Sequence, residues 1–106
     1  MKSVLLDHCV PRPFGKVIEN CAVATAFERG WQNLKNGELI EAAELANVDI
    51  LITADKNLRY QQNLDGRRIA IIELPTNRLK LVSEYAAQVN EIILTVQPGG
   101  YVVIEL

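Results

Sequence analysis

Residues 48–55, VDILITAD, join an apolar run to an acid. Val48 to Ile52 is short and mostly apolar, which is typical of a strand that is buried on both faces of a parallel sheet. The chain then passes through Thr53 and Ala54 to Asp55. Ligands of open parallel sheets bind beyond the carboxyl ends of the strands, so Asp55 is a candidate functional residue.

The segments on either side of this run repeat the pattern of short apolar stretches separated by helical ones. Predicted strands cover residues 2–6, 21–25, 68–74 and 101–106. This alternation predicts an α/β fold with three α/β/α layers, built in one domain of residues 1–106 around a mostly parallel sheet of about five strands. Right-handed crossovers restrict its topology to a few arrangements.

Three segments have the spacing of helices. Pro11 and Pro13 favour a short helix around residues 12–19, because proline suits a first helical turn. Asn36 is a candidate N-cap for a helix that runs to Ala46. Apolar residues at steps of three and four predict one long amphipathic helix from Leu79 to Val96. A short helix or turn is expected over residues 57–63.

Composition narrows the classes of protein to consider. The chain has 106 residues and a formal net charge of −2, so its overall charge does not indicate a nucleic-acid partner, and such contact would need a local basic patch. No run approaches the ~18 apolar residues of a membrane span, so we expect a cytoplasmic protein with no membrane segment. Cys9 and Cys21 are not in a CxxC motif and are expected to be reduced thiols, because His8 alone would leave a zinc site short of ligands.

Three acids fall where the predicted strands and helices place one edge of the sheet. Asp7 follows the first strand, Asp55 follows the third, and Glu38 opens the helix that leads into the third. Carboxylates that converge repel one another unless a cation lies between them. Mg²⁺ or Mn²⁺ would remove this conflict and could activate a water against a phosphodiester. The pattern therefore indicates a metal-dependent nuclease.

Each acid also has a purely structural interpretation. Asp7 could cap the helix that follows it, Glu38 is favoured by the dipole of its own helix, and Asp55 could form an Asx-turn. Glu41 and Glu44 are expected on the solvated face of their helix.

Polar and basic residues follow the same strand ends. Lys56, Arg59 and Arg78, with Lys80, could hold a nucleic-acid backbone, although scattered surface charge explains them nearly as well. Trp31 and Tyr60 are candidate stacking platforms for bases.

Four stretches together resemble a known family. LLDHCVP (5–11), NGELIEAAELA (36–46), DILITADKNLRYQQNL (49–64) and PGGYVVIEL (98–106) are similar to small bacterial PIN-like proteins that are often described as a domain of unknown function. The resemblance implies a PIN-like α/β/α fold. Many relatives are Mg²⁺- or Mn²⁺-dependent ribonucleases, and some are the toxins of toxin–antitoxin pairs. The implied partners are RNA, an antitoxin protein and a second copy of the chain.

The resemblance also assigns roles to particular residues. It marks Asp7 and Asp55 as acids of the site and Glu38 as the nearest candidate for the middle acid. His8, Asn36 and Asn57 stand where further acids are common, and with Asn77 they become secondary polar contacts. Because these three residues bring no negative charge, an RNA-binding or protein-binding module without activity is the alternative to a ribonuclease. A phosphoacceptor domain of the response-regulator kind is a third hypothesis, although no lysine ends the last strand.

Overall fold

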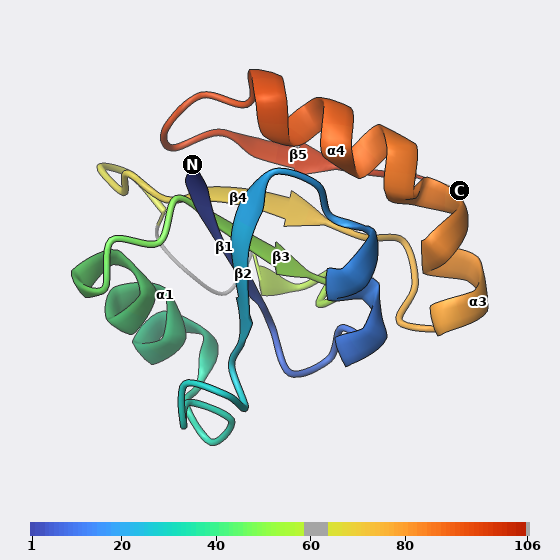
Figure 1. Ribbon diagram of the computed structural model, residues 1–106. Helices are drawn as coiled ribbons and strands as arrows, with labels where there is room; N and C mark the ends of the chain where they lie inside the picture. Colours follow the sequence, from blue (N-terminus) through green and yellow to red (C-terminus); the bar gives the residue numbers. More distant parts are fainter. Residues whose placement is uncertain (59–63, 106) are drawn as a thin grey trace.

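Five parallel strands form the central sheet, as the apolar segments predict. They are β1 (Lys2–Leu6), β2 (Cys21–Thr25), β3 (Ile50–Thr53), β4 (Ala70–Glu73) and β5 (Tyr101–Val103). The structure is a computed structural model that describes residues 1–58 and 64–105, and its strand order is β2-β1-β3-β4-β5 (Figure 1). Every neighbouring pair is parallel. The predicted α/β class with a parallel sheet is therefore confirmed.

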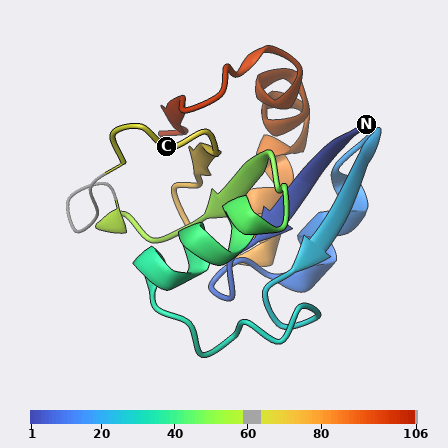
Figure 2. The ribbon, with the colours of Figure 1, turned by 90° about the vertical axis from the view of Figure 1, so that its left-hand side faces the viewer.

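Alternate residues of each strand face two separate cores, which is why the strands are apolar throughout. Leu6, Ile52 and Ile72 lie in register and pack into one core. Their neighbours Leu5, Leu51 and Ile71 pack into the other core. The helix α1 (Asn36–Leu45) covers this second core with Leu39, Ile40 and Ala43. Figure 2 shows α1 crossing in front of the sheet, so the fold has the three layers that the sequence predicts.

The opposite face carries the remaining helices, which differ from the sequence prediction. The segment after Pro11 is a 3-10 helix, η1 (Arg12–Val17), and not an α-helix. The N–H of Phe14 donates to the carbonyl of Pro11 at 3.0 Å, which is the tighter i→i+3 pattern. Phe14 is fully buried and anchors η1 in the first core.

The predicted long helix over residues 79–96 is divided into three pieces. They are α3 (Leu79–Val82), the 3-10 turn η2 (Ser83–Tyr85) and α4 (Ala86–Thr95). The hydroxyl of Ser83 donates to the carbonyl oxygen of Leu79 at 2.8 Å, which competes with the backbone ladder at the break. The apolar spacing continues across the break, with Val82, Val89 and Ile93 all buried in the first core.

The order of the strands creates a switch point between β1 and β3. From β1 the chain moves to β2 on one side, and from there it returns past β1 to β3 on the other side. Crevices at such points, beyond the carboxyl ends of the strands, are where open α/β sheets bind ligands. Asp7 follows β1 and Asp55 follows β3, so both acids lie at the switch point.

The two crossover connections that cover the first core have opposite handedness. η1 links β1 to β2, and α3–α4 link β4 to β5, and both pack into the first core. However, the chain moves in opposite directions across the sheet in the two cases. One of the two crossovers therefore departs from the right-handed rule that the sequence analysis assumed.

Within residues 1–58 and 64–105, no helix has the length and apolar character needed to cross a membrane. Predictions about Arg59, Tyr60 and the rest of residues 59–63, and about Leu106 at the end of the last strand, lie outside the described residues.

Candidate functional site at the switch point

Asp7 is a buried acid at the carboxyl end of the central strand. Its side chain is only 1% exposed, because it belongs to the row of residues that continues the buried face of Leu5. Its Oδ1 accepts the backbone N–H of His8 at 2.7 Å and lies 2.8 Å from Nδ1 of the same residue. Its Oδ2 accepts the hydroxyl of Thr53 at 2.8 Å. The carboxylate is thus held in one orientation by three polar groups.

Thr53 links the two acids of the switch point. It is the last residue of β3 and is fully buried. Its hydroxyl donates to Asp7 and accepts the backbone N–H of Asp55 at 3.0 Å. From the sequence, Thr53 is only part of the passage to Asp55. Its position on the same face as Asp7, one register step beyond Leu6 and Ile52, gives it this role.

Asp55 is half-buried and is also held on both oxygens. Its Oδ1 accepts the backbone N–H of Asn57 at 2.9 Å, which is the Asx-turn that the sequence offered as the structural interpretation. Its Oδ2 accepts the side-chain amide of Asn36 at 2.8 Å. Asn36 is the first residue of α1, whose N-cap is Lys35, so the prediction that Asn36 caps this helix is wrong. Its side chain joins α1 to the loop after β3 instead.

The three residues at which the family resemblance leads one to expect further acids all contact Asp7 or Asp55. His8 contacts Asp7, and the Asn36 amide and the Asn57 backbone contact Asp55. The side chains of His8 and Asn57 are exposed. Hydrogen bonds from these residues and from Asn36 favour the charged form of the two carboxylates and fix their orientation.

Glu38 is not part of this arrangement. It is exposed, and its Oε1 accepts the backbone N–H of Lys35 at 3.2 Å at the start of α1. This is the helix-terminal role that its position favours. Among residues 1–58 and 64–105, no three His, Cys, Asp or Glu side chains form a group that could hold a metal ion. Glu38, Asp7 and Asp55 are all described, so they do not form a three-acid metal site.

The oxygen donors at the switch point still match one kind of ion. Mg²⁺ and Mn²⁺ prefer oxygen ligands, and Mg²⁺ usually binds through one or two carboxylates while it keeps several waters. Asp7 and Asp55 supply two carboxylates whose orientation is set by Thr53 and Asn36. The donor chemistry therefore fits a hydrated hard cation held by two acids.

A pocket of about 300 Å³ opens beside Asp7, on the side of β2. Its walls come from the loops after β1 and β2, and Figure 2 shows the second of these loops at the bottom of the view. Five of its residues were not predicted from the sequence as members of the site: Val10, Arg12, Thr25, Phe27 and Gln32. Thr25 and Glu28 form reciprocal hydrogen bonds of 3.0 Å that fix the loop after β2. The spacing Thr25-x-x-Glu28 is the sequence signal that could have indicated this turn.

The predicted basic and aromatic contacts are more dispersed. Lys56, Asn77, Arg78 and Lys80 are exposed in the segments after β3 and β4. The guanidinium of Arg29 lies 5.5 Å from the centre of the Trp31 ring, and neither residue lines the pocket beside Asp7. Arg12 is the basic residue that shares the pocket with Asp7.

Cys9 contacts the same network but is a poor nucleophile. Burial raises the pKa of its thiol, and the charge of Asp7 raises it further, while the N–H of Ala54 and the Thr53 hydroxyl act in the opposite direction. The Ala54 N–H donates to Sγ at 3.3 Å. A thiol whose pKa is raised is mostly protonated at neutral pH. Its role here is to pack against Thr53 and to bind the backbone of the loop.

A further buried acid, Glu73, ends β4 in register with Thr53. It is 3% exposed, and its Oε1 accepts the hydroxyl of Tyr101 at 2.8 Å. Asp7, Thr53 and Glu73 thus form one row across three strands. In the sequence, Glu73 falls within the predicted strand over residues 68–74, and a single acid near the end of an apolar run gives no separate signal of a site.

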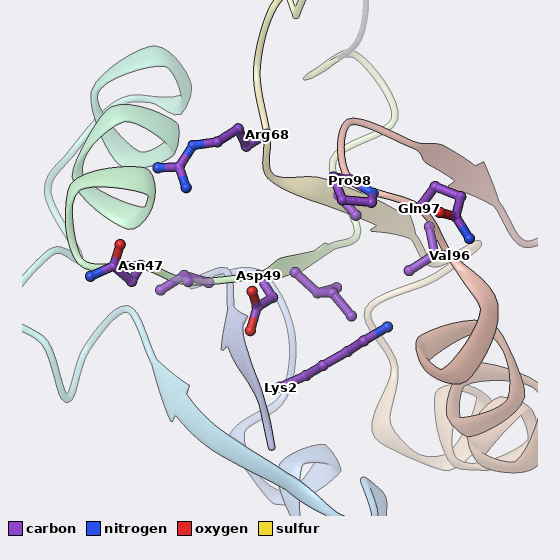
Figure 3. Close-up of a pocket in the computed structure, with 10 residues that line it drawn as sticks. Lys2, Asn47, Asp49, Arg68, Val96, Gln97 and Pro98 are labelled. Carbon is purple, nitrogen blue, oxygen red and sulfur yellow. The ribbon is translucent and has the colours of Figure 1, made fainter.

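The second concavity, of about 280 Å³, lies at the opposite edge of the sheet (Figure 3). It lies between the end of α1 and the loop before β5. Its two cations bind carbonyl groups near the C-terminal ends of helices. Nζ of Lys2 donates to the carbonyl of Ile93 in α4 at 2.5 Å. The guanidinium of Arg68 donates to the carbonyl of Glu44 in α1 at 3.4 Å. Helix C-termini carry partial negative charge, so these contacts are stabilising. None of the predicted site residues lies here.

The chain was compared with models of protein families, with curated proteins and with solved structures, and no match was found in any of the three.

Proposed function

We propose that this protein is a PIN-like, Mg²⁺- or Mn²⁺-dependent ribonuclease whose metal ligands are Asp7 and Asp55. The observation that supports the proposal most is the position of these two acids, on either side of the switch point and joined through Thr53. Its substrate is RNA, and its location is the cytoplasm. The proposed protein partners are an antitoxin or a second copy of this chain.

Each residue has a defined part in this proposal. A bound divalent cation would supply a Lewis acid for the phosphodiester and a water of lowered pKa. Asp7 and Asp55 bind the cation, and Thr53 and Asn36 keep their carboxylates in place. Arg12, Lys56, Arg78 and Lys80 are exposed cations at the same edge, where they attract the backbone of the RNA.

A cleavage assay tests the proposal. Purified protein is incubated with a mixed panel of RNAs in Mn²⁺, beside Asp7→Asn, Asp55→Asn and the double variant. Glu41→Gln is the matched control, because Glu41 is an exposed acid on the solvated side of α1. Wild type and Glu41→Gln are expected to cleave, and the three other variants are expected to lose at least about a hundredfold in rate. Equal cleavage by wild type and the double variant would reject the proposal.

A second function is favoured by one specific observation. Asn36 and His8 already hydrogen-bond the two acids and add no carboxylate, and the described residues present no three-ligand group. This arrangement fits a PIN-like module that binds RNA or a protein and does not cut. Such a module gains no stability from a divalent ion, whereas a metal-binding site raises the melting temperature by mass action. A rise with Mn²⁺ that Asp55→Asn removes would reject the second function.

The third hypothesis, a phosphoacceptor domain, has less support. Residues Tyr101–Val103 of β5 contain no lysine, and Asp7 is followed by His8 and not by an acid.

A further inference from the structure

The pocket beside Asp7 combines a buried floor with a planar, polar rim. Asp7 and Thr25 are buried and form the floor. Arg12, Phe27 and Gln32 are exposed and form the rim, and the side chain of Phe27 is 59% exposed. With a volume of about 300 Å³, the pocket is at the lower end of the range for small-ligand sites. Its size therefore favours a single small group over a large ligand.

The rim side chains offer stacking and hydrogen bonding together. The Arg12 guanidinium lies 5.2 Å from the centre of the Phe27 ring, so a planar cation and a ring are already paired there. Aromatic and guanidinium planes are the surfaces on which proteins stack unpaired bases. Gln32 carries one amide donor group and one acceptor oxygen, which can read the edge of a base. A nucleobase has a flat face that stacks on such planes and a polar edge that an amide can bond.

We infer that this pocket receives one unpaired base of an RNA strand, which stacks on Phe27 or Arg12 and bonds Gln32 through its edge. The inference rests on the proposed function for the identity of the ligand as RNA. Asp7 faces the pocket on the side of β2 and Thr53 on the side of β3. A strand that places its base against Phe27 therefore carries its backbone toward Asp7 and Asp55. A base within a duplex has no free face to stack on Phe27.

Binding of a fluorescently labelled twelve-nucleotide RNA, measured by anisotropy in EDTA, tests this inference. The same strand annealed to its complement is the second probe. Wild type is expected to bind the single strand more tightly than the duplex. Phe27→Ala is expected to weaken binding of the single strand about tenfold or more, Gln32→Ala is expected to weaken it less, and Phe27→Tyr, which keeps the ring, is expected to retain it. Leu94→Ala is the control, because Leu94 is 76% exposed on α4 and does not line the pocket.

The outcomes separate this inference from the proposed function. The pocket is not a base site if wild type prefers the duplex or does not bind the single strand. It is also not a base site if Phe27→Ala binds the single strand as tightly as wild type does and has an unchanged melting temperature. If Phe27-dependent binding is present but no RNA is cut in Mn²⁺, the base site stands and the nuclease proposal fails. If RNA is cut and Phe27→Ala cuts at the same rate, the nuclease proposal stands and the base site fails.

Discussion

The hydroxyl of Thr53 donates to Oδ2 of Asp7 at 2.8 Å, across the boundary between β1 and β3. Both side chains are buried. Thr53→Val keeps the shape of the side chain but removes the donor. We expect it to lower the free energy of unfolding by about 1–3 kcal/mol, because a buried carboxylate oxygen loses its partner. Urea unfolding measures the change. Thr53→Ser retains the hydroxyl and should lose clearly less, and an equal loss in both variants would contradict this account.

Stability is expected to depend on pH through Glu44. Burial raises its pKa, but the hydrogen bonds from Arg67 and from the backbone N–H groups of Arg68 and Ile69, with the charge of Arg67, outweigh burial and lower it. A lowered pKa in the folded state stabilises the protein above the unfolded pKa, about 4.3 for glutamate, and this contribution is lost as the pH falls through the folded pKa. Glu44→Gln should therefore be less stable than wild type at pH 7, by about 1–3 kcal/mol.

The difference between wild type and Glu44→Gln should shrink as the pH falls below about 4.3. Thermal unfolding followed by circular dichroism from pH 7 to pH 3 measures it. Glu41→Gln, on the exposed side of the same helix, is expected to leave the profile unchanged. A difference between wild type and Glu44→Gln that stays constant over this range would show that the carboxylate charge has no part in the effect.

A pair of glycines tests how tightly the loop before β5 is packed. Gly99 has φ +79° and a Cβ there would lie 2.9 Å from the carbonyl oxygen of Arg67, whereas Gly30 has φ +75° and open space around it. Gly30→Ala pays only the left-handed backbone cost of about 1–2 kcal/mol. Gly99→Ala is expected to lose clearly more in chemical denaturation, because the Arg67 oxygen must also move. Equal losses of unfolding free energy in the two variants would mean that the loop before β5 moves to accept the Cβ without further destabilisation.

Asn36→Asp should couple stability to divalent ions. The Asn36 amide donates to Oδ2 of Asp55 at 2.8 Å, so the variant places two carboxylates in contact. Without metal we expect a lower melting temperature, because close like charges repel. With millimolar Mn²⁺ we expect the variant to gain more than wild type does. Differential scanning fluorimetry with and without EDTA decides the matter, with Asn36→Ala as the variant that removes the amide and adds no charge.

The sheet could be predicted because its signal is local. Short apolar runs such as Ile50–Thr53 can be buried on both faces only in a parallel sheet between helices. The predictions that were wrong, on the long helix and on the exposure of Glu44, depend on hydrogen bonds of single side chains that apolar spacing does not reveal. Ser83 bonds the backbone and interrupts a helix whose apolar spacing is continuous. Glu44 looked like a solvated residue from its spacing, yet its side chain is only 15% exposed in its pair with Arg67.

The site was less predictable because it is made of distant pairs. Asp7 and Asp55 could be placed at one edge from strand ends alone, and the structure places them there. Glu38 could not be excluded, since the position of a helix start does not give the direction of its side chain. The pocket of Arg12, Phe27 and Gln32 depends on how two loops fold against each other, and no periodic pattern describes a loop.

The place of β1 between β2 and β3 has a consequence for synthesis on the ribosome. Its first partner, β2, ends at Thr25, but its second partner does not begin until Ile50. A growing chain therefore carries the open backbone edge of Val4, Leu5 and Leu6 while residues between these points are translated. Open strand edges of this kind template aggregation. Nascent chains that end before Ile50 should thus be clients of chaperones, whereas chains that extend well beyond Thr53 can close this edge themselves.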